Sequence, residues 1–165
     1  THLLDRVCAL DVNVLIETGA LVTGLTNYQV AEYLLGLDEG ADPHPQLPDH
    51  IEGVVFLDET STKLVLVRKS RQVVKLVDCG IPPAKRFVFY DQIHTTGMDI
   101  QHKLDATAVL TLGKDMTFRD FAQGAYRMRG LAKGKPQSLE VLLVPEVQGL
   151  INTELGPAAP PDGGA

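Results

Sequence analysis

The sequence predicts an α/β fold in which a mostly parallel sheet is flanked by helices. Short apolar segments rich in β-branched residues alternate with segments of helical periodicity, first over residues 12–57 and again over residues 86–144. Such alternation is typical of a parallel sheet whose crossovers are helices. Two hairpin-like segments lie between these units and predict a small antiparallel meander at the edge of the sheet.

The first unit has β-α-β order. Val12–Ile16 is apolar and β-branched, which predicts a buried strand. Thr26 and Gln29 have the spacing of a capping box, so we expect a helix to begin there and to end near Gly36. Gly53–Leu57 predicts the next strand, and the handedness rule for crossovers makes it parallel to the first.

The middle of the chain predicts a loop and then the meander. Residues 37–53 are acidic and interrupted by prolines, which favours a loop. Leu64–Val67 and Val73–Val77 predict the two antiparallel strands, and Pro82-Pro83 ends them.

The second unit begins with the predicted strands Arg86–Tyr90 and Ala108–Leu112, which are separated by a glycine turn. Thr117 opens a second capping box, and we expect the helix that follows to end at Gly130 and Gly134. The apolar residues of this helix recur at i, i+3, i+4 and i+7: Phe118, Phe121, Ala122 and Ala125. Leu139–Val144 predicts the last strand, which Pro145 stops.

The domain organisation follows from length and composition. The chain has 165 residues and begins with Thr1, so we expect residues 1–155 to be a single domain and a fragment of a larger protein. Residues 156–165 lack side chains to bury, and we expect a disordered tail.

The net charge of −6 hides an asymmetry along the chain. Residues 1–59 hold eleven acidic residues against Arg6, whereas residues 60–165 hold fourteen basic residues against ten acidic ones. An acidic protein is a poor candidate for coating nucleic acid, but a local basic site can still hold phosphate. No apolar run approaches the ~20 residues of a membrane span, so we expect no membrane partner.

The two cysteines, Cys8 and Cys79, are too few for a disulfide scaffold, and no spacing predicts a metal site. Reduced thiols favour an intracellular protein, cytoplasmic or nuclear. Cys79 with His94 and Asp91 or Asp99 makes a conceivable thiol triad, but its turn sequence favours a structural thiol.

The predicted helix after Thr117 carries polar side chains four residues apart. Arg119, Gln123 and Arg127 would share one face, where Gln and Arg suit phosphate oxygens. Gly124 and Ala125 beside them would allow a ligand or a neighbouring lobe to approach closely. The alternative is a solvated polar face.

The glycine turn after Arg86–Tyr90 is the second candidate. Thr95, Thr96 and Gly97 could present backbone N–H groups to an anion, and Asp99 could accept hydrogen bonds from a ribose. The alternative is an ordinary β-turn. Asp58 and Glu59 after Gly53–Leu57 also imitate a magnesium-binding strand end, but a hairpin follows. Phosphate-loop spacing is absent, so nucleotide hydrolysis by this chain alone is not expected.

Both candidates resemble motifs of a known class. HTTGMDI (residues 94–100) and AQGAYRMRG (residues 122–130) resemble motifs V and VI of superfamily 2 helicase-like motors. With GVVFLDE (residues 53–59) they are similar to the C-terminal conserved region of very large eukaryotic proteins that carry a motor region and are frequently labelled ubiquitinyl hydrolases. The resemblance covers residues 10–145.

The resemblance implies a RecA-like fold and a role for each matching residue. Gly97 and Asp99 would form the turn and its ribose-facing acid, and the hydroxyls of Thr95 and Thr96 would face the track. Gln123 and Arg127 match the first Gln and Arg of motif VI, where the Arg stabilises charge on the γ-phosphate. Residue 130 is Gly instead of the second Arg, so either Arg129 substitutes for it or the arginine finger is incomplete.

The resemblance therefore implies the second lobe of an ATP-dependent motor. ATP and Mg²⁺ would bind only between this lobe and a first lobe of the same chain, and no cofactor is expected on this fragment. The track would be nucleic acid or polypeptide. The alternatives are part of a thiol-dependent ubiquitinyl hydrolase, with ubiquitin as partner, or an inactive scaffold.

Overall fold

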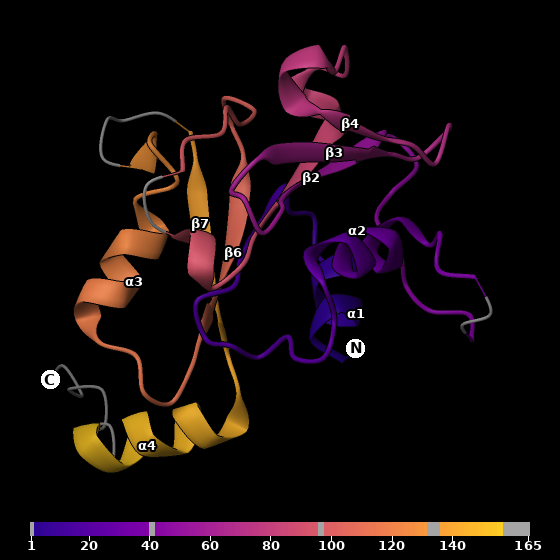
Figure 1. Ribbon diagram of the computed structural model, residues 1–165. Coiled ribbons are helices and arrows are strands. Elements are labelled where there is room, and N and C mark those ends of the chain that lie inside the picture. The colour runs from indigo at the N-terminus through magenta and orange to yellow at the C-terminus, as the bar shows by residue number, and fades with distance from the viewer. Residues whose placement is uncertain (1, 40–41, 96–97, 132–135, 157–165) are drawn as a thin grey trace, which may run out of the picture.

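The computed structural model describes residues 2–39, 42–95, 98–131 and 136–156, and it has the α/β fold that the sequence predicts. Within these residues seven strands form one sheet in the order β4-β3-β2-β5-β1-β6-β7 (Figure 1). The strands are β1 (Val14–Ile16), β2 (Gly53–Leu57), β3 (Lys63–Val67), β4 (Val73–Lys75), β5 (Arg86–Tyr90), β6 (Thr107–Leu112) and β7 (Ser138–Leu143). The five strands from β2 to β7 in this order are parallel, and β3 and β4 add the predicted antiparallel edge.

Helices cover both faces of the sheet. The α-helices are α1 (His2–Cys8), α2 (Asn27–Leu35), α3 (Phe118–Ala125) and α4 (Pro145–Leu155). In Figure 1, α1 and α2 lie together on one side of the sheet, and α3 lies on the other. The arrangement is consistent with a RecA-like lobe.

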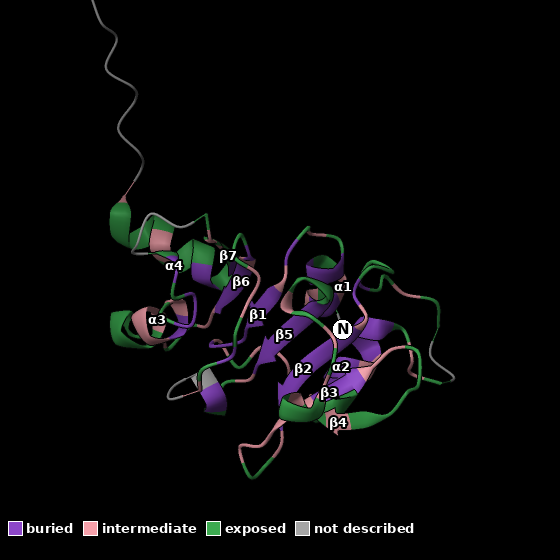
Figure 2. Cartoon of the chain, turned by 90° about the horizontal axis from the view of Figure 1, so that it is seen from above, coloured by how far each residue is buried: buried purple, intermediate pink, exposed green. Residues whose placement is uncertain are grey.

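The core has two layers because successive strand residues point to opposite faces. Leu15 packs with residues of α1 and α2, whereas its neighbours Val14 and Ile16 pack on the opposite face with Met128 and with Phe121 of α3. Every residue of β1, β2 and β5 is buried, as the purple strands at the centre of Figure 2 show. Strands covered on both faces need near-continuous apolar sequence, and these strands have it.

Both predicted capping boxes are present. The Thr26 hydroxyl accepts a hydrogen bond from the Gln29 N–H, and the Gln29 side chain accepts one from the Thr26 N–H. Thr117 and Asp120 make the same reciprocal pair at the start of α3. Two orphan N–H groups of each helix are thereby satisfied, which fixes where the helices begin.

The predicted length of α3 is wrong. The helix ends at Ala125 rather than near Gly130, and the N–H groups of Arg127 and Met128 turn back to Gly124 and Ala125 in tighter turns. Phe118, expected on the apolar face, is 82% exposed. The residue that faces the sheet closely is Gly124, where a Cβ would lie 2.8 Å from Thr18 Cγ2. Gly124 therefore serves helix–sheet packing rather than approach of a ligand.

Two of the α-helices among the described residues were not predicted. The buried residues of α1 have helical spacing: Leu4, Val7 and Cys8. The helix has only 7 residues, so this pattern is too short to predict a helix. In α4, Pro145 ends the strand as expected and then occupies the first turn, where its missing N–H costs nothing. The predicted tail beyond residue 156 lies outside the described residues. Among the helices of the described segments, none has the length and apolar character to cross a bilayer.

Candidate functional site

The predicted glycine turn lies between β5 and β6 and is anchored by apolar side chains. Ile100 is buried and Met98 is partly buried, and both pack into the core layer beneath α3. Asp99 lies between them, and its carboxylate side chain is 71% exposed. Alternation along the turn therefore presents Asp99 to solvent. Thr96 and Gly97 lie outside the described residues.

Arg127 holds this turn from inside the molecule. It is 7% exposed, and its Nη1 donates a hydrogen bond to the Met98 carbonyl oxygen. Its Nε is buried and has no hydrogen-bond partner among the described residues. Because α3 ends before Arg127, this side chain does not share the exposed helix face predicted for it with Arg119 and Gln123. The geometry makes Arg127 a positioning residue for the turn.

Arg129, two residues later, is the accessible guanidinium. Its Nε lies 3.5 Å from Asp99 Oδ1, and its side chain is 50% exposed. The guanidinium carbon also lies 4.7 Å from the ring centre of Tyr126, a cation–π contact. The two resembling segments therefore meet through two contacts, Arg127 with Met98 and Arg129 with Asp99.

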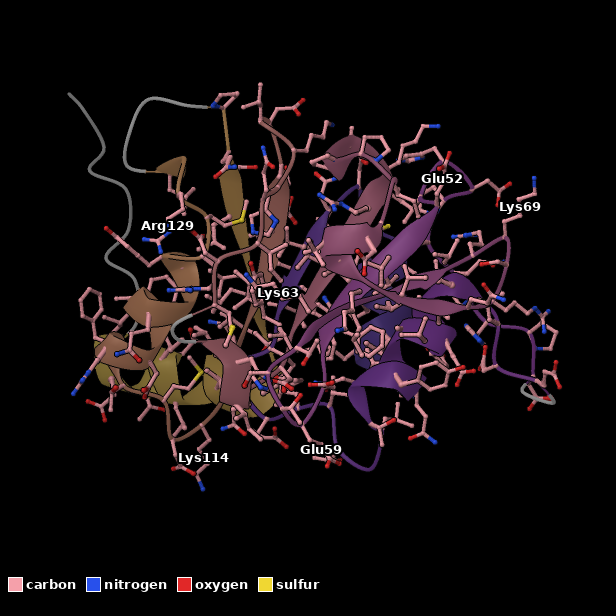
Figure 3. All side chains as sticks on the ribbon, turned by 45° about the horizontal axis from the view of Figure 1, so that its top comes forward. Glu52, Glu59, Lys63, Lys69, Lys114 and Arg129 are labelled. Carbon is pink, nitrogen blue, oxygen red and sulfur yellow. The ribbon has the colours of Figure 1, made fainter. Side chains whose placement is uncertain are left out.

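Lys63 of β3 adds a third cation that the sequence did not single out. Its Nζ donates to the Asp99 carbonyl oxygen at 2.5 Å, and Figure 3 labels both Lys63 and Arg129. We call Lys63, Asp99 and Arg129 the basic rim. No local motif connects Lys63 with residue 99, since 36 positions separate them. Only the general basic excess of the second part of the chain pointed in this direction.

A neutral hydrogen-bonded pair lies near the rim. The Tyr90 hydroxyl lies 3.1 Å from His102 Nε2. Burial raises the pKa of Tyr90 above its usual range and lowers the pKa of His102 to about 4. Both side chains are therefore uncharged at neutral pH, and Arg127 adds a positive charge to this part of the core.

Gln123 faces a different cavity, at the point where the strand connections diverge. The chain leaves β1 toward β2 but leaves β6 toward β7, and ligands of open α/β sheets commonly bind outside the carboxyl ends of such strands. A Cβ on Gly113 would lie 2.6 Å from the Gly19 carbonyl oxygen, so the backbones after β1 and β6 approach closely here. The cavity has a volume of about 530 Å³, and its polar lining includes Thr18, Gln92, Lys114, Asp115, Asp120 and Gln123.

Buried polar bonds fix the floor of this switch-point cavity. The Thr18 hydroxyl donates to the Thr111 carbonyl at 2.5 Å, and the Gly19 N–H donates to Thr111 Oγ1 at 3.1 Å. The Thr111 hydroxyl in turn donates to Glu17 Oε1 at 2.8 Å. These hydrogen bonds join the ends of β1 and β6. Gln123 lines the same cavity as Thr18 and is not part of the basic rim.

The other predicted candidates are engaged in contacts different from those predicted for them. Burial raises the pKa of the Cys8 thiol to about 12, and Cys79 packs against the core. The His94 ring contacts Ser61 and Asp91 instead of a thiol. Asp58 accepts hydrogen bonds from Thr60 and Thr62 within its own turn. Across the described segments, no three His, Cys, Asp or Glu residues are grouped to hold a metal.

The structure therefore brings together Asp99, Arg127 and Arg129, adds Lys63, and places Gln123 in a separate cavity. Comparison of the chain with protein-family models, with curated proteins and with solved structures gives no match.

Proposed function

We propose that this chain is the second, RecA-like lobe of an ATP-dependent helicase-like motor, in which the basic rim contacts the nucleotide. The observation that supports this is the meeting of the turn at Asp99 with the arginines after α3, through Arg127 and Arg129. Phosphoryl transfer depends on positioning and on positive charge near the γ-phosphate, and the rim offers both.

The proposal gives the two arginines different roles. Arg127 is buried and holds the Met98 carbonyl, so it positions the turn. Arg129 is half exposed, and its contact with Asp99 is an exposed ion pair, which is typically worth about 0–1 kcal/mol. Because this contact is weak, Arg129 can exchange Asp99 for a phosphate at little cost. Asp99 is then free to accept hydrogen bonds from a ribose.

The basic rim would offer its cations to the phosphates of ATP. Mg²⁺ would bind together with the nucleotide and would be held by residues of the first lobe. The partner in this proposal is that first lobe of the same chain, and the track is nucleic acid or polypeptide. A thiol-dependent ubiquitinyl hydrolase is not supported by the described thiols, since burial disfavours the Cys8 thiolate and the imidazole of His94 is engaged elsewhere.

The decisive experiment measures ATP turnover of a longer protein that contains both lobes. We expect Arg129→Ala to lower kcat by about 10³-fold or more, the usual effect of losing a charge-stabilising arginine. Arg6→Ala, which removes an exposed arginine from α1 on the opposite side of the sheet, is the matched control and should leave kcat unchanged. Full turnover by Arg129→Ala would contradict the assignment.

A second measurement uses the same two-lobe protein, because ATP is expected to bind only between the two lobes. Amide NMR spectra recorded with millimolar Mg·ATP should show shifts at Asp99, Ile100 and Arg129, and sodium sulfate at matched ionic strength should not reproduce the shift at Asp99. Shifts confined to residues around Gln123 would move the nucleotide site to the switch-point cavity.

A further inference from the structure

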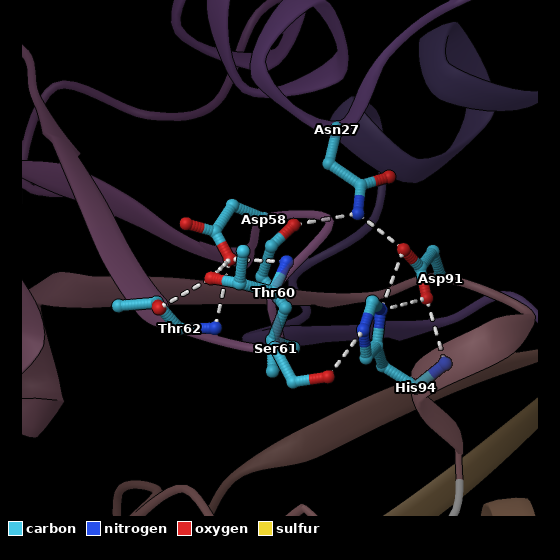
Figure 4. A network of polar contacts seen from close by, with 8 residues as sticks. Asn27, Asp58, Thr60, Ser61, Thr62, Asp91 and His94 are labelled. Atoms are coloured by element: carbon cyan, nitrogen blue, oxygen red, sulfur yellow. Dashed lines mark hydrogen bonds and ion pairs between the residues drawn. The ribbon is translucent and has the colours of Figure 1, made fainter.

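Three side chains from two separate segments form a continuous hydrogen-bond chain at the carboxyl ends of β2 and β5 (Figure 4). Ser61 Oγ lies 3.1 Å from His94 Nε2, and His94 Nδ1 lies 2.7 Å from Asp91 Oδ1. A carboxylate only accepts hydrogen bonds, so Asp91 selects the neutral tautomer with the proton on Nδ1. The lone pair of Nε2 then faces the serine hydroxyl, as a general base requires.

From this geometry we propose that Ser61 is a nucleophile, with His94 as its base and Asp91 as the residue that orients the base. The site would take an acyl group from a neutral carboxylic ester. This activity is separate from the proposed motor function and does not depend on it.

The base and its orienting carboxylate are held in place. His94 is 7% exposed, and its N–H donates to Asp91 Oδ1 at 2.8 Å. The Asn27 side-chain amide donates both to Asp91 Oδ2 and to the Leu57 carbonyl. This second layer of hydrogen bonds restricts Asp91, which in turn restricts the ring of His94.

Ser61 has an unusual backbone conformation. Its φ is +62°, in the left-handed region that residues with a side chain rarely adopt. Bonds to Asp58 hold the turn: the N–H of Ser61 donates to the Asp58 carbonyl at 2.9 Å, and the N–H groups of Thr60 and Thr62 donate to its carboxylate. Strained conformations of this kind are enriched at functional sites.

A cavity of about 600 Å³ is lined by His94 and Asp91 of the triad and by Thr60, the residue before Ser61. Its walls include the apolar side chains of Tyr28, Phe56 and Ile93, which suit an apolar acyl group. Asp58, Glu59 and Asp91 also line it, and these acids disfavour an anionic substrate. The chemistry of the cavity therefore points to a neutral ester with an apolar acyl chain.

The reaction needs no component besides the ester and water. His94 Nε2 takes the proton from Ser61 Oγ as the oxygen bonds to the ester carbonyl carbon. The bond to the alcohol oxygen then breaks, and that oxygen receives the proton from His94, which leaves an acyl-serine. Water attacks the same carbon with His94 as base, and the carboxylic acid departs while Ser61 regains its proton.

The turn limits the expected rate. The backbone N–H groups of Thr60, Ser61 and Thr62 are all occupied by Asp58, so these three donors do not stabilise an oxyanion. Losing one such donor costs about 10²–10³ in rate. A reactive probe that modifies serine irreversibly is therefore a better test than ester turnover.

The experiment treats this chain with a fluorophosphonate probe and locates the modified residue by peptide mass spectrometry. We expect modification of Ser61. Ser61→Gly should abolish it and should keep the turn, because glycine adopts positive φ readily. Ser70→Gly, which removes an exposed serine from the β3–β4 turn, is the matched control and should label like the original chain.

His94→Gln tests the base and should slow labelling by about 10²-fold or more. Far-UV circular dichroism and amide NMR spectra of each variant establish that the fold is retained. Absence of labelling in the unaltered chain, equal labelling of Ser61→Gly, or an unchanged rate in His94→Gln would each overturn the proposal. Addition of Mg·ATP should leave the rate unchanged, so this outcome is independent of the motor proposal.

Discussion

At the scale of single residues, His102 near the basic rim makes the stability of the fold depend on pH. Burial lowers its pKa from 6.5 to about 4, and Arg86 and Arg127 act in the same direction while Asp99 opposes them. Between these two pKa values the unfolded chain binds a proton that the folded chain does not. The contribution of His102 to stability is therefore complete above pH 6.5 and is lost as pH falls toward 4.

We expect His102 to account for about 2 kcal/mol of the stability lost between pH 7.5 and pH 5. Urea unfolding at the two pH values measures this loss. In His102→Gln the loss should be smaller by that amount, whereas His50→Gln, which removes an exposed histidine, should behave like the original chain. Identical pH dependence in the original chain and in His102→Gln would contradict a partly buried, neutral His102.

At the scale of elements, two helical glycines should respond in opposite ways to the same substitution. A Cβ at Gly124 in α3 would lie 2.8 Å from Thr18 Cγ2 and 3.0 Å from Leu110 Cδ1, whereas a Cβ at Gly149 in α4 would meet nothing within 4 Å. Gly149→Ala should therefore raise the free energy of unfolding by about 0.5–1 kcal/mol through helix propensity. Gly124→Ala should lower it by about 1–3 kcal/mol because α3 must move away from the sheet.

Urea denaturation of the two variants measures both effects on one scale. Hydrogen exchange adds a local measurement, since displacement of α3 should speed exchange in α3 and leave α2 unaffected. Stabilisation by Gly124→Ala would show that α3 does not pack tightly on β1 and β6.

At the scale of the whole molecule, the sequence predicted the sheet and the end of α2 at Gly36 better than the end of α3. β2 and β5 were predicted with their observed bounds, because strands buried on both faces require near-continuous apolar sequence. The end of α3 was missed because the residues after Ala125 form tight turns and Arg127 turns inward to the Met98 carbonyl. Nothing in the helical spacing distinguishes an arginine that leaves the helix from one that continues it.

The candidate site was predictable only where its residues are close in sequence. The turn at Asp99 and the arginines near residue 127 each carry a local pattern, and β5, β6 and α3 bring these patterns together. Lys63 and Ser61 come from the β2–β3 hairpin, and their partners Asp99 and His94 are more than 30 positions away. Contacts of this kind depend on the order of the strands, which no local pattern encodes.

The order of the strands also makes Thr111 important for the whole molecule, because this fully buried side chain of β6 ties β6 to the end of β1. Thr111 Oγ1 donates to the buried Glu17 carboxylate and accepts from the Gly19 N–H. Thr111→Val keeps the side-chain shape but removes both bonds, and it leaves the buried Glu17 carboxylate and the partly buried Gly19 N–H each without one partner. We expect the free energy of unfolding to fall by about 2–4 kcal/mol.

Thr107→Val on the same strand is the matched control, because the Thr107 hydroxyl bonds Ser138 in an exposed pair. It should change the free energy of unfolding by less than about 0.5 kcal/mol. Calorimetry and urea unfolding measure the stability of both variants. Amide exchange at Gly19 and Leu21 should become faster only in Thr111→Val. If both variants were equally stable, the ends of β1 and β6 would be joined by packing alone. In that case these hydrogen bonds would not give the switch-point cavity the rigid floor that a ligand site beside Gln123 requires.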